Sequence, residues 1–181
     1  MNGFHLSEAG HLAVLLPPQS ISGASSAAPI NPAFSMKNYC HASILIIAGA
    51  EATQDATTLL LYLCSTAAGA NPVAIPFNYF LQKSGAAYGV AGGDVLGAMN
   101  SATAAGLVLS AANLPPNGVI VIEIDDRELE GATGGVLAGV LGADSYLGVG
   151  LGSPAAVDLA CVAVILSGPR IGAASSPSVT V

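Results

Sequence analysis

Charged residues are scarce in this sequence. Of 181 residues, 8% are Asp, Glu, Lys or Arg, whereas 52% are hydrophobic. A soluble domain ordinarily has about a quarter charged residues and keeps large apolar patches off its surface. A lone monomer of this composition would be poorly soluble. We therefore expect a subunit of an assembly, in which other protein covers much of the surface and function is exerted through contact surfaces.

Long apolar runs are also missing. A membrane-spanning helix needs about 20 apolar residues, and the run 44–48 is bounded by His41 and Glu51. The segment 134–152 is apolar for longer, but Asp144 interrupts it and its glycines disfavour a helix. The N-terminus lacks the basic region and apolar core of a signal peptide. We expect no membrane partner and synthesis in the cytoplasm.

Basic residues are few, and tryptophan is absent. The chain has 4 basic residues against 11 acidic ones, a net charge of −7. Lys37, Lys83, Arg127 and Arg170 are scattered, whereas nucleic-acid binding needs clustered basic side chains. We expect no direct nucleic-acid ligand. With no Trp and only 5% aromatic residues, a carbohydrate-binding module is a weaker alternative.

The cysteines do not suggest a disulfide framework. There are 3 of them, an odd number: Cys40, Cys64 and Cys161. Each lies in an apolar run with the composition of a strand, and free cysteine is among the most often buried residue types. We predict three buried free thiols.

Short runs of strand-like composition recur along the chain, separated by Gly, Pro and Asn. Such spacing is typical of β-sandwiches and barrels. The sequence therefore predicts an all-β fold, a β-sandwich or jelly-roll-like antiparallel domain over residues 39–174. The predicted strands are 11–16, 41–48, 57–64, 73–80, 119–125 and 157–167.

Alternation is clearest in the run 119–125. Its isoleucines share one face, whereas Glu123 and Asp125 share the other, so a strand would bury the isoleucines and expose the carboxylates. The run 157–167 is apolar at nearly every position. This pattern predicts a strand that is covered on both faces.

Two other segments have more than one interpretation. The segment 94–112 permits a helix because of its alanines, but Gly97 and Gly106 weaken a helix, and the alternative is a strand-loop-strand excursion. In the aromatic run that follows Pro76, alternation places Phe77 and Tyr79 on one face. That face could belong to the core or to an interface.

Residues 1–38 are predicted to form an extended N-terminal arm, and 175–181 a short tail. Pro17 and Pro18 prevent the arm's apolar run from being a central strand. We expect the arm to add a strand to a neighbouring subunit, so that deleting 2–32 leaves the domain folded but impairs assembly. The expected partner contacts are Phe4, His5, His11, Leu12, Val14, Leu15 and Leu16.

No residue pattern indicates catalysis or metal binding. Carboxylates could hold Ca²⁺ or act as an acid–base pair, but a strand running into a capped turn explains the acidic cluster, and its spacing is not that of an EF-hand. The histidines lack zinc spacing, and no Gly-x-Ser-x-Gly pattern is present. We predict no catalytic residue, no cofactor and no metal. The acidic cluster comprises Glu123, Asp125, Asp126, Glu128 and Glu130.

Segments along nearly the whole chain carry a family resemblance. They are MNGFH at 1–5, SEAGH at 7–11, PPQ at 17–19, YCHASI at 39–44, AIPFNY at 74–79, GDVLGA at 93–98, VIEID at 121–125 and AVILSGPR at 163–170. Together they resemble a family of small virion proteins encoded near the major capsid gene of tailed bacteriophages. The glycine- and alanine-rich segment 131–152 departs from the family's pattern, so no strand is assigned there.

The resemblance implies a non-enzymatic structural protein of the virion. Its implied role is a capsid decoration, or cement, protein on the capsid exterior. The implied partners are the major capsid protein and further copies of the chain itself, as a dimer or trimer. A head-completion, connector or tail subunit is the alternative within virions. The resemblance supplies no catalytic residue.

Overall fold

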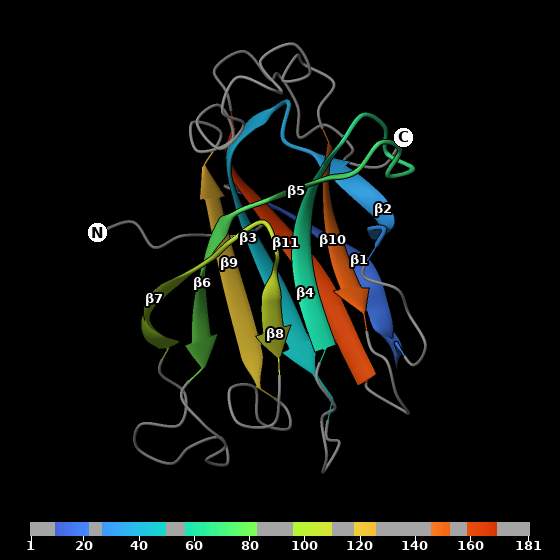
Figure 1. The fold of residues 1–181 in the computed structure, drawn as a ribbon. Coiled ribbons are helices and arrows are strands. Elements are labelled where there is room, and N and C mark those ends of the chain that lie inside the picture. Colours follow the sequence, from blue (N-terminus) through green and yellow to red (C-terminus); the bar gives the residue numbers. More distant parts are fainter. Residues whose placement is uncertain are drawn as a thin grey trace, which may run out of the picture.

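The computed structural model describes residues 10–21, 27–49, 57–82, 96–109, 118–125, 146–152 and 159–169. These residues form two antiparallel sheets (Figure 1). The predicted all-β class is thereby confirmed. Within the same ranges, no helix has the length and apolar character needed to cross a membrane.

The strands divide between a large and a small sheet. Their bounds are β1 Gly10–Ser20, β2 Ile30–Ser35, β3 Tyr39–Ala48, β4 Thr57–Cys64, β5 Val73–Ile75, β6 Phe77–Gln82, β7 Leu96–Ala102, β8 Leu107–Leu109, β9 Val119–Asp125, β10 Tyr146–Gly152 and β11 Leu159–Pro169. The large sheet has the order β1-β11-β3-β9-β6-β7. The small sheet has the order β2-β10-β4-β5, with β8 also paired to β4.

The pairing of the strands is nested. β1 pairs with β11, β2 with β10, β3 with β9 and β4 with β8, always antiparallel. From β1 to β4, and again from β8 to β11, consecutive strands alternate between the sheets. The chain is therefore a long antiparallel ribbon folded over itself, which is the arrangement of a jelly roll. β5 to β7 are an excursion from this ribbon, and β6 and β7 widen the large sheet.

The core lies between the two sheets and is apolar. In β9 the predicted alternation is confirmed, because Ile120, Ile122 and Ile124 are buried while Asp125 is exposed. The side chains that meet them from β3, β11, β4 and β10 are equally buried. They include Ile44, Ile46, Val162, Val164, Leu166, Leu59, Leu61, Leu63, Leu147, Val149 and Leu151.

The predicted strand 73–80 is divided at Pro76. The residues before it form β5 in the small sheet, and those after it form β6 in the large sheet. Proline has no N–H to donate to a ladder, so it suits the point where the chain changes sheets. Phe77 and Tyr79 belong to the core, with ring centroids 6.1 Å apart. The core interpretation of that face is therefore the correct one.

Within the segment 94–112, the described residues 96–109 form a strand-loop-strand excursion. The helical alternative is wrong for these residues. β7 leads through a tight turn into β8, and the N–H of Gly106 donates to the carbonyl of Thr103 at 2.9 Å. Gly106 has a φ of 89°, and a Cβ there would lie 2.6 Å from the carbonyl oxygen of Leu59. Glycine is thus required by both backbone conformation and space.

The sequence pattern does not predict two of the observed strands, β2 and β10. β10 falls in the glycine-rich segment 131–152, where glycines alternate with Leu147, Val149 and Leu151. A Cβ on Gly148 would lie 2.5 Å from the Cβ of Pro29. This glycine therefore lets the chain that precedes β2 lie directly against the small sheet. β2 itself falls in the segment predicted to be an arm.

The prediction of an extended arm over 1–38 is wrong for residues 10–21 and 27–38. β1 pairs with β11 at the edge of the large sheet, and β2 pairs with β10. Several apolar side chains of this segment, among them Leu15, Leu16, Ile21 and Phe34, are buried in the chain's own core. Pro17 and Pro18 coincide with a shift in the β1 register, and β1 is an edge strand, as the two prolines require.

Candidate functional site

A polar cluster lies on the outer face of the large sheet, which faces away from the small sheet. His41 and Ser43 are on β3, where they lie opposite Asp125 and Glu123 of β9. The residues that alternate with them are buried in the core, so all four side chains point outward. We refer to these four residues as the His41 cluster.

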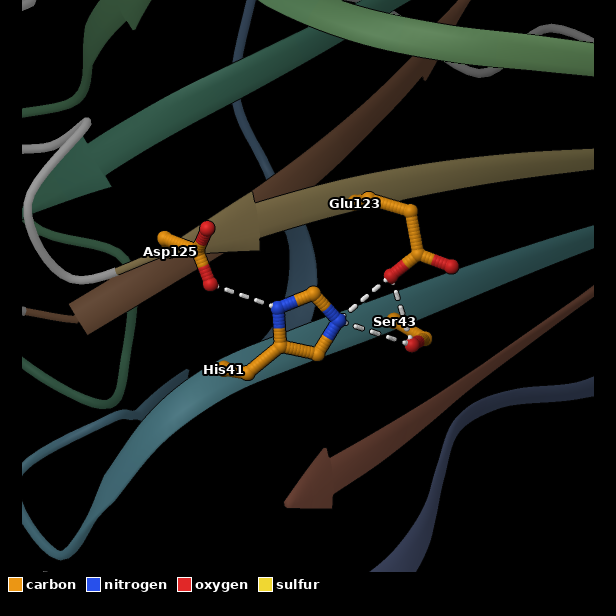
Figure 2. A network of polar contacts seen from close by, with 4 residues as sticks. All are labelled: His41, Ser43, Glu123 and Asp125. Atoms are coloured by element: carbon orange, nitrogen blue, oxygen red, sulfur yellow. Dashed lines mark hydrogen bonds and ion pairs between the residues drawn. The ribbon is translucent and has the colours of Figure 1, made fainter. Parts of the chain in front are cut away.

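The imidazole of His41 bridges the two carboxylates (Figure 2). Its Nδ1 lies 2.8 Å from Oδ1 of Asp125, and its Nε2 lies 2.6 Å from Oε2 of Glu123. Ser43 Oγ donates to the same Glu123 oxygen at 2.7 Å and lies 3.3 Å from His41 Nε2. The cluster thus connects the two strands through charge-assisted hydrogen bonds.

This arrangement favours the charged form of His41. Partial burial lowers its pKa, but the hydrogen bonds and negative charges of Asp125 and Glu123 outweigh burial, so the pKa is raised above 6.5. With a carboxylate at each ring nitrogen, both nitrogens act as donors, which only the imidazolium can do. In the protonated form that this arrangement favours, His41 is a cation held between two carboxylates.

Ser43, His41 and Asp125 have the connectivity of a nucleophile-base-acid triad, but the protonation pattern opposes that chemistry. A general base needs a free lone pair on the nitrogen that faces the serine. Here the Nε2 proton is directed at Glu123, and Ser43 also donates to Glu123. The geometry is that of a cross-strand ionic network.

The same geometry is unsuited to a metal ion. Each carboxylate faces a different ring nitrogen, so the imidazole separates the two anions. In the ranges that the structure covers, no group of three or more His, Cys, Asp or Glu side chains is arranged to hold a metal. Asp126, Glu128 and Glu130 lie outside those ranges.

The sequence predicts the acidic cluster that contains Glu123 and Asp125 but not its histidine partner. The spacing of the histidines excludes a zinc site and does not connect His41 to these carboxylates. The available signal was a pair of matching patterns, His-x-Ser and Glu-x-Asp, each alternating with buried residues. Only the register between β3 and β9 brings these patterns together.

We expect the stabilisation by His41 to depend on pH. Because its pKa is raised in the folded state, the contribution is complete below 6.5, the ordinary pKa of histidine, and is lost as the pH rises through the folded-state pKa. Urea unfolding of the wild type and of His41→Gln at several pH values should therefore give a difference in stability that shrinks as the pH rises. Glu123→Gln should weaken this dependence, whereas Ser43→Ala, which removes no charge, should preserve it. Parallel profiles for wild type and His41→Gln would contradict the ionic network.

Beside the His41 cluster, one apolar residue from each strand of the large sheet lies in a line on the outer face. The strand registers place these side chains opposite one another from edge to edge. We refer to them as the apolar row. Its members, in the order β1, β11, β3, β9, β6 and β7, are Val14, Ala163, Leu45, Val121, Phe80 and Met99.

The apolar row is open to solvent in the single chain. Val14 is 56% exposed and Met99 60% exposed, and the residues between them are half-buried. The prediction that the strand 157–167 is covered on both faces is therefore wrong within this chain, because the outer side chains of β11 are half-exposed. An outer sheet face ordinarily carries polar residues. In the described ranges the charged side chains are Lys37, Glu123, Asp125 and, when protonated, His41, and none belongs to the row.

The predicted partner contacts differ in their exposure to solvent. Leu15 and Leu16 are buried in the chain's own core, so their assignment as contacts is wrong. Leu12 and Val14 are exposed on the outer face, and His11 is half-exposed on β1. Phe4 and His5 lie outside the described residues.

The three cysteines are free, as predicted, but they are not all buried. Cys64 is buried, and burial raises the pKa of its thiol to about 11. Cys161 is half-exposed on the outer face and Cys40 is exposed. The expectation of three buried thiols is therefore correct only for Cys64.

No protein-family model, curated protein or solved structure matches this chain. The resemblance to phage virion proteins stays a prediction. The inferences about function below rest on the residues of the chain itself.

Proposed function

We propose that this protein is a non-enzymatic structural subunit of a phage virion. Its role is that of a capsid decoration protein, which stabilises the head by binding neighbouring major capsid subunits. The observation that carries the proposal is the apolar row on the outer face of the large sheet. The assignment to a phage rests on the resemblance in sequence, and the docking surface rests on the exposure of the row.

Burial of the apolar row would stabilise a complex. Covering a fully exposed Val, Leu, Phe or Met side chain contributes about 1.5–3 kcal/mol. In the row Val14 and Met99 are exposed, whereas Leu45, Val121 and Phe80 are already half-buried and would each contribute less. The row runs from one edge of the sheet to the other without a charge. A partner could therefore bury it without desolvating an ion, while the His41 cluster stays at the wet border.

The fold is compatible with this role but does not select it. Jelly rolls occur in viral capsid domains, lectins and cupins, and a fold alone does not define a function. The His41 cluster lacks the free base of a hydrolase and the convergent ligands of a metal site. The exposed apolar row of the large sheet supports a role in protein contacts.

We expect Val14→Lys to impair binding to the capsid, because an ammonium group at the β1 end of the apolar row would have to be desolvated on docking. When the variant is added to particles that lack the protein, its occupancy should be about tenfold or more below that of the wild type. Quantitative mass spectrometry of reconstituted and washed particles measures this occupancy. Gln19→Lys, which places the same charge on an exposed position of β1 outside the row, is the matched control.

Three outcomes would change the conclusion. If Val14→Lys occupies particles as well as the control does, the apolar row is not the docking surface. The number of copies in native particles separates a decoration protein from a connector or tail subunit, because a shell carries hundreds of copies and a neck carries a single ring. Absence from purified particles would contradict the virion role itself.

A further inference from the structure

The free edges of the two sheets differ in how they are protected. Sheet edges expose unpaired N–H and C=O groups, and proteins usually blunt them with proline, charge, irregular register or short length. β1 contains Pro17 and Pro18 and has two register shifts. β2 contains Pro32 and a register shift, and β5 is only 3 residues long, between Pro72 and Pro76.

β7 has none of these protections along most of its length. Its 7 residues, LGAMNSA, include no proline and no charged side chain. From Ala102 to Met99 it pairs with β6 without interruption, and the one register shift falls beyond Met99. β7 forms the outer edge of the large sheet (Figure 1), and among the described strands none pairs with its far side.

We propose that β7 pairs antiparallel with β7 of a second copy, which forms a two-fold dimer with one continuous sheet. An isologous contact brings the same strand against itself, and like charges that lie opposite each other oppose such pairing. The uncharged sequence of β7 offers no such repulsion in any register. The β7 strand of a second copy can therefore pair along this edge without repulsion between like charges.

The register centred on Met99 uses the whole strand. It pairs Met99 with Met99 of the second copy, Ala98 with Asn100, Gly97 with Ser101 and Leu96 with Ala102, so all 7 residues find a partner. These are small or uncharged side chains. Met99, now 60% exposed, would lie at the two-fold axis and be covered by its own copy.

The dimer goes beyond the proposed function and also extends its surface. Met99 ends the apolar row at the β7 edge. Joining two large sheets at this edge would place two apolar rows on one face, related by the two-fold axis. The dimer could then contact two capsid subunits at once, but it would form whether or not a capsid is the partner.

Sedimentation equilibrium of the full-length protein tests the dimer. We expect a dimer for the wild type and for Val14→Lys, which carries the charge on the opposite edge of the sheet. Met99→Lys places two ammonium groups opposite each other and should raise the dimer dissociation constant by about tenfold or more. If the wild type is monomeric, or if Met99→Lys dimerises as well as Val14→Lys, the proposal is overturned.

A cross-link tests the register. With Cys40→Ser and Cys161→Ser as background, Met99→Cys should form a disulfide-linked dimer under mild oxidation, because directly opposed strand residues lie within disulfide reach. Ala104→Cys, in the exposed turn after β7, should not. Equal cross-linking of the two variants would contradict this register. Sedimentation and cross-linking are measured without capsid, and Val14→Lys should dimerise normally, so a failure of one proposal is distinguishable from a failure of the other.

Discussion

Deleting residues 2–32 is expected to abolish folding. The deletion removes β1 and the first half of β2, and with them the buried side chains of Leu15, Leu16 and Ile21. Losing one buried aliphatic side chain costs about 2–5 kcal/mol, and a whole domain is stable by only about 5–15 kcal/mol. The edge of β11 would also lose its antiparallel partner.

Circular dichroism and urea unfolding of the truncated protein measure this effect. The expected result is no cooperative transition. A shorter deletion of residues 2–9 is the control, because it keeps every described strand and should unfold cooperatively. If the longer deletion also unfolds cooperatively with wild-type stability, β1 is dispensable and the original interpretation of an arm is restored.

The second large effect is expected at the centre of the large sheet. Ile122 is 0% exposed and lies between Ile44 of β3 and Tyr79 of β6. Ile122→Ala leaves a cavity among fixed neighbours, and we expect it to lower the free energy of unfolding by about 3–4 kcal/mol. Val121→Ala removes a half-exposed side chain of the apolar row and should cost about 1 kcal/mol or less.

These two variants test the register of β9 through adjacent residues. Urea denaturation at a single pH gives both free energies, and an unchanged slope shows that the unfolded states remain comparable. A shift of one residue in a strand exchanges its inner and outer faces. If Val121→Ala proves more destabilising than Ile122→Ala, Val121 faces the core, Ile122 faces outward, and the described register of β9 is wrong.

The sequence alone determined the fold class and the bounds of its most regular strands. The predicted runs 57–64 and 119–125 coincide with β4 and β9. Their signals are local, because composition and a period of two identify a strand and its buried face without reference to any other segment. The low content of charge predicts contacts with other protein, and this stays a prediction.

Only the tertiary structure decided where the segment before residue 39 belongs. An edge strand and an extended arm have the same local pattern of apolar residues and prolines. The difference is the pairing of Gly10 with Ser167 and of the residues that follow, which joins the two ends of the described chain. No local pattern reports such a contact, since it depends on how the whole ribbon folds.

The candidate site was decided in the same way. His41 is 84 residues from Asp125 and 82 from Glu123, and the apolar row takes one residue from each strand of the large sheet. Alternation predicts that each of these side chains faces outward or inward, but it does not say which of them are neighbours. That is set by the register between strands distant in the sequence, because the register follows from burial of the common core rather than from any one strand.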